Sequence, residues 1–106
     1  MLFVAAAGNG NLYEIGYDID RHPVYPASFP YDNIITTGNL LFNGHLDESS
    51  NYGQINVDLG CSRTYILSTV PADTYAYMTG TSIAAPMVTG AAALLYSGLR
   101  ISAFQM

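Results

Sequence analysis

Positive charge is nearly absent from this sequence, and charge of either sign is scarce. Lys and Arg together number three against eight Asp and Glu, and charged residues make up 10% of the 106 positions. Nucleic-acid binding depends on basic side chains that contact phosphates, so this composition disfavours such a function. Soluble domains average about 25% charged residues, which leads us to expect that much of this chain is buried.

Cysteine and long apolar runs are scarce as well. Cys61 is the single cysteine, so an internal disulfide and a cysteine-based zinc site are excluded, and we interpret Cys61 as a free buried thiol. No run approaches the ~20 apolar residues that span a membrane, and no membrane partner is expected. The apolar start at residues 1–7 lacks a basic leader and stops at Gly8, which argues against a secretory signal.

Apolar residues, in contrast, are plentiful. Half of the chain is hydrophobic, which is too much for a disordered tail. A chain of this length is about one small domain, and such a domain buries only about 60–65% of its unfolded surface. We therefore interpret residues 1–106 as part of a larger domain whose neighbouring structure is missing from this chain.

Several short strands are predicted ahead of one helix. Residues 2–7 form a continuous apolar run that ends in turn residues, a pattern typical of a strand buried on both faces of a parallel sheet. Its three alanines are poor strand formers, so something close by must require small side chains. Alternation and β-branched content predict further strands at 33–38, 55–59, 65–70 and 75–78.

The helix is predicted from about Ser82 to Ser97, with Gly98 as its stop signal. Almost no polar face remains among its residues, and a helix that is apolar nearly all round is expected to be buried. Short strands followed by one buried helix indicate an α/β or α+β fold.

Ser82 stands at the entrance to this helix, where two interpretations compete. A hydroxyl at this position can simply cap the helix by accepting from an amide of the first turn. A catalytic role is favoured by Gly80, which leaves space for a partner, and by the positive end of the helix, which would stabilise an oxyanion. Pro86 supports that role too, since a proline this early removes a hydrogen bond from the first turns.

The run Gly80–Pro86 (GTSIAAP), followed by Val88–Leu95 (VTGAAALL), resembles the nucleophile motif of the subtilisin-like serine proteases. Val4–Asn9 (VAAAGN) resembles the strand and turn that carry the oxyanion asparagine of that family. The resemblance implies that Ser82 is the nucleophile and that Asn9 donates its side-chain amide to the developing oxyanion, beside the backbone N–H of Ser82. It also implies that the primary specificity pocket is lined by small residues, namely Ala6, Ala7 and Gly8.

Other blocks follow the order of the same family. Tyr25–Phe29 and the strand after it resemble the family's Tyr-Pro-Ala segment, which predicts a cis peptide bond at Tyr25–Pro26. With the stretch from Ser50 to Thr69 included, the resemblance covers roughly residues 3–98. It implies an α/β fold: the C-terminal portion of a subtilisin-like parallel-sheet sandwich with a buried central helix at about 82–97.

The acid and the base of the family's triad are missing from the expected place. In this family the triad runs in the order Asp, His, Ser, and both earlier motifs should precede Asn9, where this chain has only eight residues and neither Asp nor His. His22 and His45 both follow Asn9, and we interpret them as ordinary loop histidines. The chain is therefore interpreted as a fragment that is inactive alone, because a serine without a base is a poor nucleophile.

Asp18 and Asp20 form an Asp-x-Asp pair that suggests a metal site. Two carboxylates fall well short of the six or more oxygens that calcium prefers, so we interpret the pair as part of a solvated loop. No metal or other cofactor is expected, although calcium is possible in the complete family domain.

The resemblance implies a serine endopeptidase that hydrolyses polypeptides through an acyl-enzyme once the missing Asp- and His-bearing half is supplied. The alternative is an inactive remnant that binds peptides or a partner through the old cleft. An unrelated esterase fits less well, because its Gly-x-Ser-x-Gly motif needs glycine where Ala84 stands. Family analogy suggests an extracellular or secretory-pathway enzyme, although no residue encodes the compartment. We also expect open sheet edges, an uncovered helix and marginal stability in the isolated chain.

Overall fold

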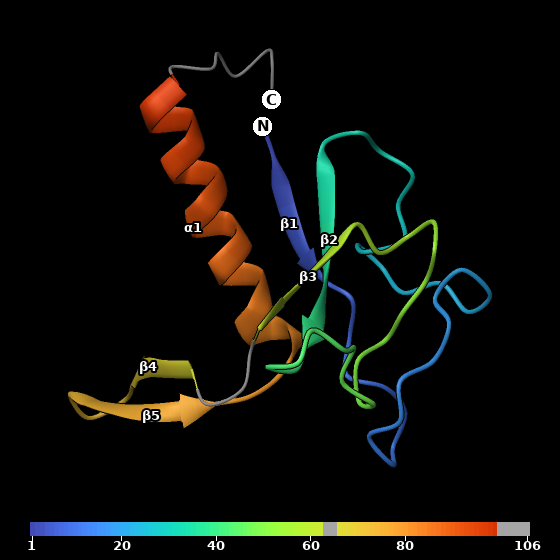
Figure 1. Ribbon diagram of the computed structural model, residues 1–106, viewed down its shortest axis with the longest axis horizontal. Helices are drawn as coiled ribbons and strands as arrows, with labels where there is room; N and C mark the ends of the chain where they lie inside the picture. Colours follow the sequence, from blue (N-terminus) through green and yellow to red (C-terminus); the bar gives the residue numbers. More distant parts are fainter. Residues whose placement is uncertain (63–65, 100–106) are drawn as a thin grey trace.

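Five strands and one helix follow one another along the chain in the computed structural model, which describes residues 1–62 and 66–99 (Figure 1). The mixture of strands and one C-terminal helix confirms the predicted α/β class. The elements are β1 (Phe3–Ala6), β2 (Ile34–Leu40), β3 (Leu59–Ser62), β4 (Ile66–Val70), β5 (Thr74–Met78) and α1 (Thr81–Leu99).

The first three strands form a parallel sheet in the order β1-β2-β3. Phe3 pairs with Ile34, and Thr37 pairs with both Ala6 on one side and Leu59 on the other. The strands predicted at 2–7 and 33–38 are therefore confirmed, as is their parallel arrangement. The strands predicted at 65–70 and 75–78 are confirmed as an antiparallel hairpin, β4–β5, within the described residues. Cys61 lies half-buried in β3, which is an outer strand of the parallel sheet.

The strand predicted at 55–59 is wrong, because the pairing begins only at Leu59. The alternation of apolar and polar residues there comes from a turn whose amides are already occupied. The backbone N–H groups of Ile55 and Asn56 donate to the carboxylate of Asp20, at 3.0 and 2.9 Å. Because those donors are engaged in the loop, this segment does not extend the sheet.

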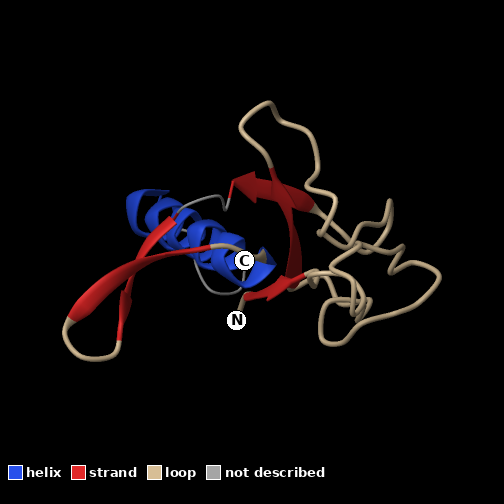
Figure 2. Ribbon diagram, turned by 90° about the horizontal axis from the view of Figure 1, so that it is seen from below, coloured by secondary structure: helices blue, strands red, loops and turns tan. Residues whose placement is uncertain are grey.

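Helix α1 lies on one side of the parallel sheet and the long loops lie on the other (Figure 2). On the loop side, the Thr36 hydroxyl donates to the carbonyl oxygen of Ala27 at 2.8 Å. The cis bond predicted at Tyr25–Pro26 in these loops is confirmed. The small core lies between β1 and the loops and consists of Ala5, Ala7, Ile19 and Ala27.

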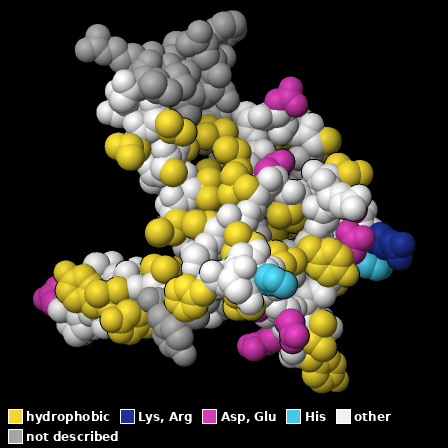
Figure 3. Space-filling model, in the orientation of Figure 1, with side chains coloured by type: hydrophobic (Ala, Val, Ile, Leu, Met, Phe, Trp, Pro, Cys, Tyr) yellow, Lys and Arg dark blue, Asp and Glu magenta, His cyan; other side chains and the backbone are white. Residues whose placement is uncertain are grey.

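The predicted burial of the helix holds only for the face that packs on the sheet. Ala84 is fully buried, whereas Leu94 and Leu95 are 75% and 58% exposed. Figure 3 shows hydrophobic side chains gathered over α1 and over the β4–β5 hairpin. The physical reason is that one three-stranded sheet covers one side of a helix that is apolar nearly all round. The expectation of an uncovered helix in this chain is thus confirmed. Among residues 1–62 and 66–99, no helix combines the length and the hydropathy needed to cross a bilayer.

Candidate active site

The parallel sheet brings the end of β1 next to the start of α1 (Figure 1). Asn9 follows β1 in a turn, and Thr81 is the first residue of the helix. These two residues are 72 positions apart in sequence, yet the backbone amide of Thr81 donates to Oδ1 of Asn9 at 2.8 Å. The fold therefore joins the two motifs that the sequence analysis assigned to one catalytic site.

Thr81 determines which way the Asn9 amide group points. Oδ1 of Asn9 accepts from both the backbone N–H and the hydroxyl of Thr81, the latter at 2.9 Å. The Thr81 hydroxyl in turn accepts from the backbone N–H of Gly8 at 3.1 Å, and Thr81 is fully buried. With Oδ1 held by Thr81, Nδ2 of Asn9 is left as the available donor of the amide group, next to Gly80. No acceptor for that Nδ2 occurs among the residues that the structure describes.

A second free donor lies in the first turn of α1. The amides of Ile83 and Ala84 donate to the carbonyl oxygen of Gly80, at 2.9 and 3.2 Å, and the amide of Thr81 is used by Asn9. The amide of Ser82 has no partner within the helix, because first-turn N–H groups have no carbonyl four residues before them inside it. The Ser82 residue is exposed. Its hydroxyl, its backbone N–H and Nδ2 of Asn9 thus belong to the same helix entrance.

The interpretation of Ser82 as a simple helix cap is wrong in this structure. The side-chain acceptor that caps α1 is Oδ1 of Asn9, which comes from the β1 turn. This leaves the Ser82 hydroxyl without a capping role, at the end of a helix where the dipole favours negative charge.

Gly80 is required at its position for two reasons. Its φ is +145°, a backbone conformation that a residue with a Cβ rarely adopts. A Cβ built on Gly80 would also lie 3.3 Å from Nδ2 of Asn9. A side chain here would therefore crowd the candidate oxyanion donor, which agrees with the space that the sequence predicts at this glycine.

Ala6, Ala7 and Gly8 lie where the sequence placed them, at the end of β1 and in the turn after it. Ala7 is fully buried and extends the sheet by donating to the carbonyl oxygen of Thr37 at 2.9 Å. The role of these three residues in a specificity pocket stays a prediction. A cleft of about 520 Å³ does open beside Asn9 and Gly80. Sequence reasoning missed its other lining residues, which carry no motif: Glu14, Asp47, Glu48, Ser49 and Thr79.

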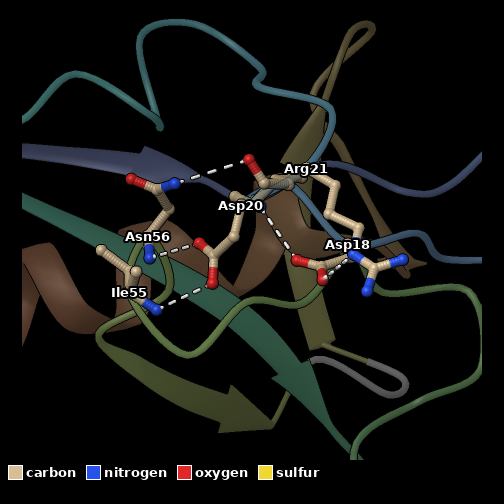
Figure 4. Close-up of polar contacts among 6 residues, drawn as sticks. Asp18, Asp20, Arg21, Ile55 and Asn56 are labelled. Atoms are coloured by element: carbon tan, nitrogen blue, oxygen red, sulfur yellow. Dashed lines mark hydrogen bonds and ion pairs between the residues drawn. The ribbon is translucent and has the colours of Figure 1, made fainter.

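The Asp18–Asp20 loop has a structural role (Figure 4). Asp20 accepts from the amides of Ile55 and Asn56, and Asp18 accepts from the amide of Asp20 at 2.9 Å. The hydrogen bond from the Ile55 amide has the largest effect and lowers the pKa of Asp20 below its usual value. Desolvation opposes it, and hydrogen bonds from Asn56 and from the Gln54 amide add to the lowering. The pair lies in a half-exposed loop, and the carboxylate of Asp20 binds the backbone of a second loop at residues 55–56.

The remaining ionisable candidates lie in loops. Asp18 pairs with Arg21 at 3.9 Å. His22 meets the ring of Tyr17 edge-on with centroids 6.4 Å apart, and both His22 and His45 are exposed. Within the described part of the chain, no three His, Cys, Asp or Glu side chains are grouped so that they could hold a metal ion.

Comparison with known proteins gives consistent matches. Residues 1–103 match the sequence profile of the subtilase family. The chain is 36% identical over 96 residues to "Subtilisin-like protease 2" of Plasmodium falciparum, which covers 91% of this chain and 7% of that protein. It is 39% identical over 97 residues to the "Major intracellular serine protease" of Bacillus subtilis, which covers 92% of this chain and 28% of that protein.

Among solved structures, the prenylagaramide maturation protease PagA superposes with a TM-score of 0.73 at 31% sequence identity. That match covers 92% of this chain and 32% of the PagA chain. The chain thus spans less than a third of the length of each of these three proteins.

Proposed function

The chain belongs to the subtilase family, and on that premise we propose that it is the nucleophile-bearing part of a serine endopeptidase. The observation that carries the proposal is the held amide of Asn9. Its Oδ1 is bound twice by Thr81, its Nδ2 is left as a donor next to Gly80, and the free amide of Ser82 lies in the first turn of the helix that follows. Two preorganised donors next to an exposed serine hydroxyl are what acyl transfer requires.

In the proposed reaction, Oγ of Ser82 attacks the carbonyl carbon of a peptide bond and loses its proton to a general base. The carbonyl oxygen becomes negatively charged, and it accepts from Nδ2 of Asn9 and from the backbone N–H of Ser82. The carbon–nitrogen bond then breaks, the amine leaves with the proton from the base, and an acyl-enzyme remains on Ser82. Water releases the acyl group by the reverse sequence of proton transfers.

The base must come from outside this chain. His22 and His45 lie in exposed loops, and neither forms a hydrogen bond with Ser82 in the described residues. Loss of the histidine costs about 10⁶ in turnover, a figure that derives from this same enzyme family. We therefore propose that the chain alone is inactive and that an Asp- and His-bearing N-terminal half completes it.

The exposed apolar surface supports completion by a large partner. Leu94, Leu95 and Tyr96 on α1 are 75%, 58% and 42% exposed, and Tyr75 and Tyr77 on the hairpin are 69% and 66% exposed. Apolar patches of this kind mark surfaces that are covered in the functional state. An N-terminal half that packs on the uncovered side of α1 would bury them while bringing the base to Ser82.

A fluorophosphonate that labels activated serines tests the proposal. The coding sequence upstream of Met1 is first read for Asp-Thr-Gly and His-Gly-Thr-His motifs, and the chain is then produced alone and completed by that half. We expect labelling and peptide cleavage only after completion. Labelling should be lost in Ser82→Ala and kept in the matched control Ser97→Ala, which changes an exposed serine of the same helix.

Two results would contradict the proposal in different ways. Labelling of Ser82 in the isolated chain would refute its inactivity. A completed, folded protein that neither labels nor cleaves peptides would refute the endopeptidase and would support an inactive remnant that binds peptides through the same cleft. The compartment is not assigned by family membership, since one relative is named as an intracellular protease; we keep the extracellular or secretory-pathway location as a proposal.

A further inference from the structure

Asn51 lies in the loop between β2 and β3 and is 1% exposed. All hydrogen-bonding atoms of its side-chain amide are used. Nδ2 donates to the carbonyl oxygen of Ala7 at 2.9 Å, and Oδ1 accepts from the backbone N–H groups of Gly10 and Tyr17, at 3.1 and 3.2 Å. Its own backbone N–H donates to the carbonyl oxygen of Gly8 at 3.0 Å.

These bonds hold the backbone on both sides of Asn9. Ala7 and Gly8 precede Asn9 and Gly10 follows it, so three of the four contacts fall within two residues of the candidate oxyanion asparagine. The fit is close, since a Cβ built on Gly8 would lie 2.5 Å from Nδ2 of Asn51. Gly8 has a φ of +103°, a backbone conformation that glycine adopts readily and that a residue with a Cβ rarely does, so both this φ and the contact with Asn51 require glycine here.

We propose that Asn51 is the positioning residue of the oxyanion hole. It holds the backbone of the Asn9 turn, while Thr81 holds the side chain of Asn9. Asn51 itself touches no reacting atom. This inference rests on the proposed function, because it assumes that Nδ2 of Asn9 stabilises the oxyanion.

The chemistry of the position favours an amide. The site offers one carbonyl oxygen that needs a donor and two N–H groups that need an acceptor, and a planar amide supplies both from one side chain. Aspartate at this position would keep the acceptor for Gly10 and Tyr17 but would lose the donor to Ala7. Alanine would leave the buried carbonyl oxygen of Ala7 and the partly buried amides of Gly10 and Tyr17 without these partners, which is costly.

The test uses the completed enzyme and measures kcat and KM for peptide cleavage together with the melting temperature. We expect Asn51→Ala to lower kcat by about 10- to 100-fold with little change in KM, because a small misplacement of a donor weakens only transition-state binding. Asn51→Asp should also lose kcat, because its carboxylate oxygen would face the carbonyl oxygen of Ala7, and the melting temperatures show whether either variant is misfolded. Ser28→Ala is the matched control: Ser28 is also buried and also binds a loop amide, that of Val24, but it lies in a different loop.

A double-mutant cycle with Asn9→Ala separates positioning from general destabilisation. If Asn51 acts through Asn9, a substitution at Asn51 costs almost nothing further in kcat once the Asn9 amide is gone. Losses that multiply in the double variant would overturn the inference, and so would an Asn51→Asp enzyme whose kcat matches that of Ser28→Ala. A wild-type enzyme without turnover would instead overturn the proposed function itself, and the inference with it.

Discussion

Replacing Asn9 with aspartate should keep the cap of α1 and abolish catalysis, because the two tasks fall to different atoms of one side chain. Oδ1 accepts the two hydrogen bonds from Thr81, and Nδ2 is the proposed oxyanion donor. Aspartate keeps an oxygen at Oδ1 and replaces the donor with a second oxygen. Alanine removes both atoms, so the pair of variants separates stability from turnover.

The expected change in stability follows from the cap. Asn9→Ala removes the acceptor for the buried amide and hydroxyl of Thr81, and loss of an N-cap of this type costs about 1–2 kcal/mol. Asn9→Asp should lie within about 0.5 kcal/mol of the wild type, or above it, because a carboxylate at a helix N-terminus interacts favourably with the helix dipole.

The expected change in turnover has the opposite order. Loss of one oxyanion donor costs about 10²–10³ in kcat, a value that derives from this same enzyme family and is not worked out from this structure. Asn9→Ala should show a loss of that size. Asn9→Asp should lose more, because its carboxylate would repel the oxyanion that forms beside it.

The assay compares the melting temperature and kcat of the three proteins in the completed enzyme. An aspartate variant that keeps kcat within a few-fold of the wild type would refute Nδ2 as an oxyanion donor. An aspartate variant that melts as low as the alanine variant would refute Oδ1 as the cap.

Three further predictions concern stability and assembly. Gly80→Ala should destabilise the protein by about 1–3 kcal/mol, because the φ of +145° at this position suits only glycine. Gly90→Ala is the control: its new methyl group meets nothing within 4 Å, and it should stabilise the isolated chain by about 0.5–1 kcal/mol. Equal melting temperatures of these two variants would contradict the prediction. The pKa of Asp20 is lowered in the folded state, so the ionised carboxylate should stabilise the fold at neutral pH, and this stabilisation should be lost as the pH falls below about 4. In urea titrations, the Asp20→Asn variant should lack that pH dependence of the free energy of unfolding. Leu94 is 75% exposed on α1, so Leu94→Lys should reduce aggregation of the isolated chain in size-exclusion chromatography. The same substitution should weaken assembly with the N-terminal half. Unchanged behaviour in both assays would argue against coverage of this face of α1.

Local pattern accounts for what could be predicted. The strand before Asn9, the helix after Ser82 and the hairpin between them follow from short apolar runs and turn residues that act over a few positions. The same reasoning failed at residues 55–59, because alternation also arises in a turn whose amides are held by Asp20, 35 and 36 positions earlier in the chain. The burial of α1 was overestimated for a related reason. Apolarity indicates that a surface is suited to burial, but the partner that buries it must be present.

The sequence by itself determined the family and the two motifs of the site, because residue types at fixed spacing around Asn9 and Ser82 carry the resemblance. Only the tertiary structure decided how the site is held together. Thr81 orients Asn9 from 72 positions away, and Asn51 holds the same turn from 41 and 44 positions away. Hydrogen bonds over such separations leave no periodic trace in a single sequence, since they depend on where the sheet and the helix bring the backbone. The nucleophile could therefore be identified from sequence, while the contacts that position its oxyanion donor required the fold.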